Sequence, residues 1–180
     1  MFPPHNPKAN VFTFKGFDTL KLTVSTIVFN SGFNRPGLDV VDLSRFVNVT
    51  QIEFGEKCFV NVGGLRLVGL RQLKSVVVGD DCFVKGRSTE KAPRYCFCVK
   101  DCPSLTELKT GCNSFSGFTV GEIENVDALE RVKLGENAFQ CASLELKGLG
   151  SLWGLRNRFG EVAFGGSGQE RVLYVLESGV

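Results

Sequence analysis

A phrase of eight residues returns along this chain and constrains its fold more than any other feature. The phrase starts as a strand-like apolar stretch, turns at a glycine and ends on a phenylalanine. Close copies occupy residues 52–59, 76–83 and 132–139, with a looser copy at 108–115. Successive final rings therefore lie 24, 32 and 24 residues apart, at Phe59, Phe83, Phe115 and Phe139. Self-similarity at such a period predicts a stack of small units that share one core.

A second recurring piece accompanies this phrase. Residues 65–73 and 144–152 carry leucines and a glycine at matching positions, and residues 12–20 follow the same order. Each unit is therefore expected to contain a strand, a turn, a phenylalanine-anchored bend and a second strand. Alternation at the ends of 73–78 and 129–134 is typical of half-buried strands. Strands are expected near 20–29, 49–54, 73–78, 105–110, 129–134 and 152–157, with a terminal one at 171–176.

The predicted fold class is a β-rich repeat solenoid, a curved stack of about six to seven units of about 24 residues without long helices. Residues 1–10 are expected to form a proline-rich tail, and residues 11–180 a single solenoid. The longer step between phenylalanines predicts a polar, basic loop insertion near 85–94, which serves either as a recognition loop or as tolerated padding. The apolar terminal piece indicates either end-to-end self-association or a longer array.

One stretch of the chain resembles a known repeat family. Residues 129–144 are similar to a leucine-rich repeat of the BspA-like subclass, which writes a strand, a glycine, an alanine–phenylalanine pair, a cysteine and a leucine. The resemblance covers residues from about 38 to 155, and more loosely from 11, although Cys58, Cys82 and Ser114 replace the alanine. The resemblance implies a curved solenoid whose strands line one face. It also implies recognition or adhesion, which is the usual function of this family.

Composition narrows the classes of function. With 21 basic and 19 acidic residues the net charge is +2, which argues against nucleic-acid binding. The sequence contains no run of about 18 uncharged apolar residues, so no membrane span is expected. Residues 1–8 lack the layout of a secretory signal, and seven cysteines fit a disulfide framework poorly. The expected location is cytoplasmic, or the cell surface if the chain is a fragment of a longer protein.

Catalysis is not expected. The only histidine is His5, in the proline-rich tail, so no Ser-His-Asp or Cys-His arrangement can be assembled on a rigid scaffold. The glycines match no phosphate-binding loop of the P-loop kind. We therefore predict a protein that is not an enzyme and needs no cofactor.

The cysteines fall into two groups. Cys58 and Cys82 occupy a slot that takes Ser114 or Ala138 in other units, which predicts a buried small-residue position. The others considered together are Cys96, Cys98, Cys102 and Cys112. Four thiolates can bind zinc, but the paired C-x2-C spacing is absent, and strand neighbours two apart share a face without any metal. Buried structural thiols are favoured, and zinc is kept as the alternative.

A contact surface is predicted from the positions between the core-facing residues of each strand. One row would contain Gln51, Ser75, Glu107, Arg131 and Gly154, and the next Glu53, Val77, Lys109, Lys133 and Arg156. Trp153 would lie alongside, and Trp and Arg are frequent at the energetic centres of interfaces. These residues predict a non-catalytic module that binds a protein or peptide, of acidic character. The alternatives are ordinary solvated charges, or a structural or adhesive surface element within a longer array.

Overall fold

The computed structural model describes residues 10–12, 23–85, 96–140, 143–147, 163–164 and 174–176. Within these residues every regular element is a β-strand and none is a helix. The strands are β1 (Asn10–Phe12), β2 (Thr26–Phe29), β3 (Val40–Asp42), β4 (Gln51–Phe54), β5 (Gly64–Val68), β6 (Ser75–Val78), β7 (Cys96–Lys100), β8 (Glu107–Thr110), β9 (Val120–Glu124), β10 (Arg131–Leu134), β11 (Ser143–Lys147), β12 (Ala163–Phe164) and β13 (Tyr174–Leu176).

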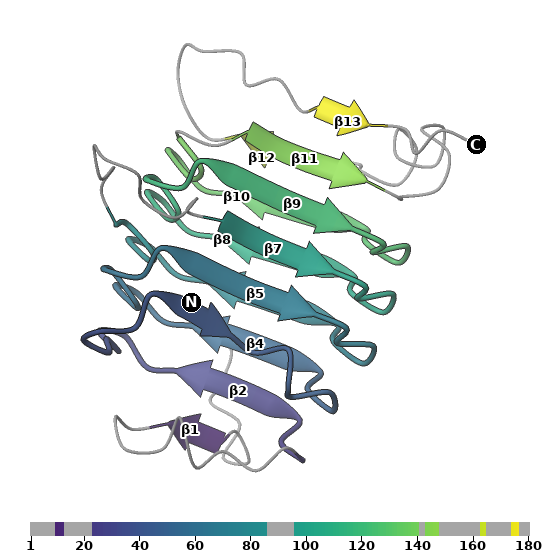
Figure 1. Ribbon diagram of the computed structural model, residues 1–180, viewed down its shortest axis with the longest axis horizontal. Helices are drawn as coiled ribbons and strands as arrows, with labels where there is room; N and C mark the ends of the chain where they lie inside the picture. Colours follow the sequence, from purple (N-terminus) through teal and green to yellow (C-terminus); the bar gives the residue numbers. More distant parts are fainter. Residues whose placement is uncertain are drawn as a thin grey trace.

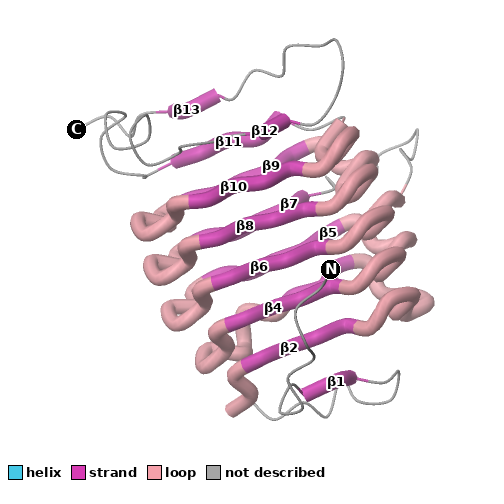
Figure 2. The backbone as a smooth tube through the Cα atoms, turned by 180° about the vertical axis from the view of Figure 1, so that it is seen from behind, coloured by secondary structure: helices cyan, strands magenta, loops and turns pink. Residues whose placement is uncertain are grey.

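These strands form two sheets in which every pairing is parallel (Figure 1). The seven-stranded sheet has the order β1-β2-β4-β6-β8-β10-β12, and the six-stranded sheet has the order β13-β11-β9-β7-β5-β3. From β2 onward the chain passes from one sheet to the other with each successive strand, and Figure 2 shows the seven-stranded sheet from its outer side. The predicted β-rich, helix-free architecture is confirmed for the described residues.

Most of the predicted strands of the seven-stranded sheet are found. Residues 20–29, 49–54, 73–78, 105–110 and 129–134 contain β2, β4, β6, β8 and β10, and residues 171–176 contain β13. The strand that pairs with β10 is β12, with Lys133 opposite Ala163. The prediction that a strand at 152–157 follows β10 in this sheet is therefore wrong, because the chain takes a longer step here than between β8 and β10. Residues 152–157, residues 1–9 of the expected tail and 86–94 of the expected insertion lie outside the described residues.

A column of phenylalanine rings fills the space between the sheets. The rings of Phe59, Phe83, Phe115 and Phe139 stack in succession, with centroids 5.5, 4.9 and 4.7 Å apart and interplanar angles of 18, 8 and 8°. All four residues have φ between 52 and 58°, a left-handed backbone that costs a residue with a Cβ roughly 1–2 kcal/mol. Ring pairs contribute about 0.5–1.5 kcal/mol beyond the area that they bury, so the column offsets much of this strain.

The residue before each of these phenylalanines is fully buried, as the small-residue slot predicts: Cys58, Cys82, Ser114 and Ala138. The slot also carries hydrogen bonds between neighbouring bends. The Cys82 thiol donates to the carbonyl oxygen of Gly55 at 3.0 Å, and the Ser114 hydroxyl donates to that of Gly79 at 2.7 Å. In turn the Cys82 N–H donates to Ser114 Oγ at 3.1 Å. These side chains therefore connect successive bends as well as filling space.

Thr110 interrupts the apolar interior at the end of β8. Its side chain is buried, and Thr110 Oγ1 has no hydrogen-bond partner among the described residues. An unsatisfied buried hydroxyl costs about 1–3 kcal/mol. Thr110 pairs with Val78 on β6, which occupies the same interior position without a hydroxyl.

We expect Thr110→Val to raise the free energy of unfolding by about 1 kcal/mol, because it removes the unpartnered hydroxyl and keeps the side-chain shape. Urea denaturation followed by circular dichroism measures the change. The reciprocal variant Val78→Thr is the control and should lower stability by a similar amount. Loss of stability in Thr110→Val would show that the hydroxyl has a partner.

Candidate functional site

The outer face of the seven-stranded sheet carries the rows that the sequence predicts. Parallel pairing places Gln51, Ser75, Glu107 and Arg131 in one row from β4 to β10. The second row runs through Glu53, Val77, Lys109 and Lys133. Both rows are confirmed up to β10. Beyond it the position beside Lys133 belongs to Ala163, so the prediction of Arg156 at that place is wrong, and Trp153 and Arg156 themselves lie outside the described residues.

The charges of these rows are engaged unequally. Arg131 Nη1 lies 3.2 Å from Glu107 Oε1, and this exposed ion pair is worth at most about 1 kcal/mol. Lys109 and Lys133 are exposed, face each other across β8 and β10, and form no ion pair within the described part of the chain. Adjacent strands lie about 4.8 Å apart, so the two lysines are close enough for one anion to contact both ammonium groups.

Glu53 is separated from this cationic pair. It lies in the same row as Lys109, but β6 stands between their strands and contributes Val77 at the intervening position. The sequence-predicted surface thus divides into a weakly acidic part on β4 and a cationic part on β8 and β10. Within these rows only the cationic part has two residues of like charge paired on adjacent strands, Lys109 and Lys133.

The outer face of the six-stranded sheet contains a hollow of about 370 Å³. Cys96, Cys98 and Lys100 line it from β7, while the alternate residues Phe97 and Val99 belong to the buried core. This confirms that both thiols of the Cys96–Cys98 pair point to one face. From the neighbouring strands the hollow is lined by Val40, Gly64, Arg66, Val68 and Glu122.

Pairing places Cys98 at the centre of a grid of outward side chains. Arg66 on β5 and Glu122 on β9 flank it directly, so that the Cys98 residue is only 7% exposed. Gly64 on β5 stands beside Cys96 and contributes no side chain to the hollow. Sequence reasoning missed Arg66, Lys100 and Glu122 as neighbours of the thiols. The signal that locates them is the alternation of side chains along β5, β7 and β9, the strands that carry them.

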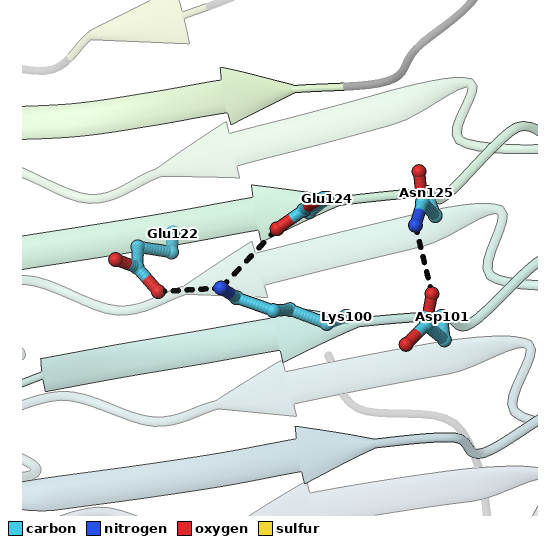
Figure 3. Close-up of polar contacts among 5 residues, drawn as sticks. All are labelled: Lys100, Asp101, Glu122, Glu124 and Asn125. Atoms are coloured by element: carbon cyan, nitrogen blue, oxygen red, sulfur yellow. Dashed lines mark hydrogen bonds and ion pairs between the residues drawn. The ribbon is translucent and has the colours of Figure 1, made fainter.

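A network of polar contacts borders the hollow (Figure 3). Lys100 Nζ lies 2.8 Å from Glu122 Oε2 and 3.2 Å from Glu124 Oε2. The hydrogen bond with Glu122 is the first cause that raises the pKa of Lys100, so its ammonium stays charged. At the end of these strands Asn125 Nδ2 donates to Asp101 Oδ1 at 2.8 Å, which ties the two bends together. The cation beside the thiols is thereby fixed in position.

The two thiols of β7 differ in acidity. The Cys96 thiol donates a hydrogen bond that lowers the pKa of Cys98 to about 7, against an opposing effect of burial and with help from the Lys100 charge. The same interaction raises the pKa of Cys96, because removing its proton would place a second negative charge beside the first. The first proton of the pair therefore leaves from Cys98 near neutral pH.

The four cysteines considered as a zinc site do not come together. Cys102 is buried, its thiol donates to the Lys100 carbonyl oxygen at 3.3 Å, and burial raises its pKa to about 11. Cys112 is exposed in the bend that follows β8, a strand of the seven-stranded sheet, whereas Cys96 and Cys98 lie on the six-stranded sheet. In the ranges that the structure describes, no group of three or more histidine, cysteine or carboxylate side chains is arranged to hold a metal ion. The four-cysteine zinc alternative is therefore wrong, and His5 lies outside the described residues.

No protein-family model matches the chain, and no curated protein or solved structure is significantly similar to it. The described part of the chain contains no helix with the length and apolar character that a membrane crossing requires.

The lowered pKa of Cys98 predicts a distinctive alkylation profile. We expect the rate of Cys98 modification by iodoacetamide to reach half its maximum near pH 7, since the thiolate is the nucleophile. Quenched samples analysed by peptide mass spectrometry assign the modified sulfur. Because the Cys96 hydrogen bond is the largest cause of the lowering, Cys96→Ala should move the midpoint to higher pH. A midpoint near the ordinary thiol value of 9.0 in the unaltered protein would contradict this arrangement.

Proposed function

We propose that this chain is a repeat solenoid of the leucine-rich-repeat kind that binds a protein or peptide partner and catalyses no reaction. Its contact surface is the outer face of the seven-stranded sheet, and the partner presents carboxylates to it. The observation that carries this proposal is the exposed pair Lys109 and Lys133, which face each other on β8 and β10.

The solenoid assignment rests on equivalent positions that meet across successive units. Phe59, Phe83 and Phe115 stack on one another, and the residues before them share one buried slot. Exposed amides repeat the pattern: Asn113 Nδ2 donates to Asp81 Oδ1 at 3.0 Å, and Asn137 Nδ2 donates to Asn113 Oδ1 at 3.3 Å. Contacts between equivalent residues of neighbouring units are what a stacked repeat predicts.

The cationic pair supports an acidic partner on electrostatic grounds. Like charges directly opposite each other on neighbouring strands destabilise a sheet, so the pair is a cost to the free protein. A carboxylate between the two ammonium groups would relieve that cost and gain charge-assisted hydrogen bonds. Arg131, one position along β10 from the inward Val132, adds a third cation whose contact with Glu107 is weak enough to be exchanged.

A structural or adhesive element of a longer array is the second candidate. Among the described strands the seven-stranded sheet ends at β12 and the six-stranded sheet at β13, and each of these two strands has one described partner. An unpaired strand edge is a template for another strand, which would allow end-to-end self-association. This candidate predicts contacts through the ends of the sheets, and not through Lys109 and Lys133.

The test is a peptide selection with charge reversal. We expect a random peptide library selected on the unaltered protein to yield sequences rich in Asp and Glu. Their affinity, measured by fluorescence anisotropy, should fall by roughly tenfold or more in Lys109→Glu/Lys133→Glu, because a lost charge-assisted contact costs about 1.5–3 kcal/mol. Binding should also weaken with added salt.

The matched control is Lys57→Glu/Arg71→Glu, which makes the same change in net charge at two exposed bends outside the rows. It should bind the selected peptides like the unaltered protein after allowance for long-range charge. Equal loss in both double variants would reduce the effect to net charge alone. Peptides that bind the Lys109→Glu/Lys133→Glu protein unchanged would overturn the proposed surface, and concentration-dependent end-to-end assembly would favour the array.

A further inference from the structure

We infer that Cys96 and Cys98 form a two-thiolate site for a soft monovalent metal ion of the Cu(I) class, in the hollow on the outer face of the six-stranded sheet. This site lies on the sheet opposite to the proposed contact surface and does not depend on it. Nothing in the fold or in the apolar core requires two cysteines at these outward positions, where the other strands carry Gly64, Arg66, Val120 and Glu122.

The backbone of β7 holds the two sulfurs on the same side. Cys96 and Cys98 are two residues apart on one strand, so their side chains leave the sheet in the same direction. Both residues line the same hollow. A small cation that binds between the sulfurs displaces their protons, and only the two side chains have to turn toward it.

The same backbone disfavours a disulfide between these residues. A strand rises about 3.3 Å per residue, which puts the two Cα atoms near 6.6 Å apart, at the upper end of the range that a disulfide spans. β7 pairs with β5 on one side and β9 on the other over all five of its residues, so it cannot contract without breaking pairing. The pair is therefore kept as two thiols, the form that binds metal.

The number and type of ligands select the ion. Zinc requires about four ligands in tetrahedral geometry, and no third histidine, cysteine or carboxylate joins a metal-binding group in the described residues. Magnesium and calcium require oxygen ligands. Thiolates are soft donors that favour Cu(I), and a monovalent ion of closed d-shell is satisfied by two sulfurs in line.

Charged side chains around the hollow act on the complex that a bound ion would form with the two thiolates. Two thiolates with one monovalent cation carry a net charge of −1, and binding releases the protons of both thiols with no change of oxidation state. Arg66 beside Cys98 and Lys100 two residues along β7 supply positive charge to this anion. Glu122 and Glu124 oppose it, but both carboxylates contact Lys100, at 2.8 and 3.2 Å, so the surroundings of the sulfurs are close to neutral.

The hollow also gives an ion access to the sulfurs. Cys96 is half-buried, and its neighbour on β5 is Gly64, so no side chain covers it from that strand. Cys98 lies deeper, beneath the flanking Arg66 and Glu122. The site therefore opens toward solvent at Cys96, whereas Cys98 is reached through the hollow and is 7% exposed.

The experiment titrates the reduced protein, without oxygen, into Cu(I) held by bicinchoninate, and follows the loss of the coloured complex. We expect one equivalent to be withdrawn, with affinity lowered by more than roughly 100-fold in Cys96→Ala and in Cys98→Ala. Cys112→Ala, which removes an exposed thiol elsewhere, is the matched control and should bind like the unaltered protein. X-ray absorption of the loaded protein should show two sulfur neighbours.

Three results would overturn the inference. One is retention of the tight equivalent in Cys96→Ala/Cys98→Ala, and another is its loss in Cys112→Ala. The third is absence of uptake by reduced protein that forms a Cys96–Cys98 disulfide in air, which would make the pair a redox couple. Circular dichroism and thermal unfolding of each variant separate loss of the site from loss of the fold, and these outward substitutions should leave both unchanged.

Discussion

Parallel pairing in a fixed register is the constraint on which the whole molecule depends. Side chains of a strand alternate between its faces, so a slip of one residue would turn a core row outward and a charged row inward. Close approach of the bends keeps this register. A Cβ at Gly79 would lie 2.7 Å from the carbonyl carbon of Gly55, so the two turns fit only without side chains. The stacked phenylalanines and the amide contacts add specificity at the same bends.

The register gives the two outer faces different characters. On the seven-stranded sheet Lys109 and Lys133 face each other without a described counter-ion, whereas on the six-stranded sheet Lys100 lies between Glu122 and Glu124. The first face presents two lysines side by side, where the proposed acidic partner would make its contacts. The second is largely neutralised within itself and surrounds two thiols. One scaffold therefore presents two chemically distinct surfaces, one on each side of a shared apolar interior.

Sequence reasoning predicted the parts of the structure that follow from local alternation and spacing. The strands that became β4, β6, β8 and β10 and the two rows that they carry were all predictable, because pairs such as Gln51 and Ser75 have the same place in matching phrases. The position beside Lys133 was not, because the chain takes a longer step before β12. The preference for buried structural thiols is confirmed for Cys98 and Cys102, and it is wrong for Cys112, which is exposed in a bend.

The contact between thiols and charges was also beyond sequence reasoning. Arg66, Cys98 and Glu122 are far apart along the chain and meet only through the pairing of β5, β7 and β9. Their individual patterns predict outward side chains, but the choice of neighbours requires the register of the second sheet. The ion pair of Arg131 with Glu107 is a similar case: the sequence predicts both strands, but the contact depends on the register between β8 and β10.

The connection from β6 to β7 has a consequence for how such a chain can change over time. Ser75 and Glu107 are paired neighbours although 32 residues separate the equivalent positions, while Gln51 and Ser75 pair across 24. Neighbouring strands of this sheet therefore pair in the same register whether the connection between them is short or eight residues longer. Residues can be gained or lost at that crossing, and a foreign peptide can be grafted there, without turning any other side chain of the protein to the opposite face.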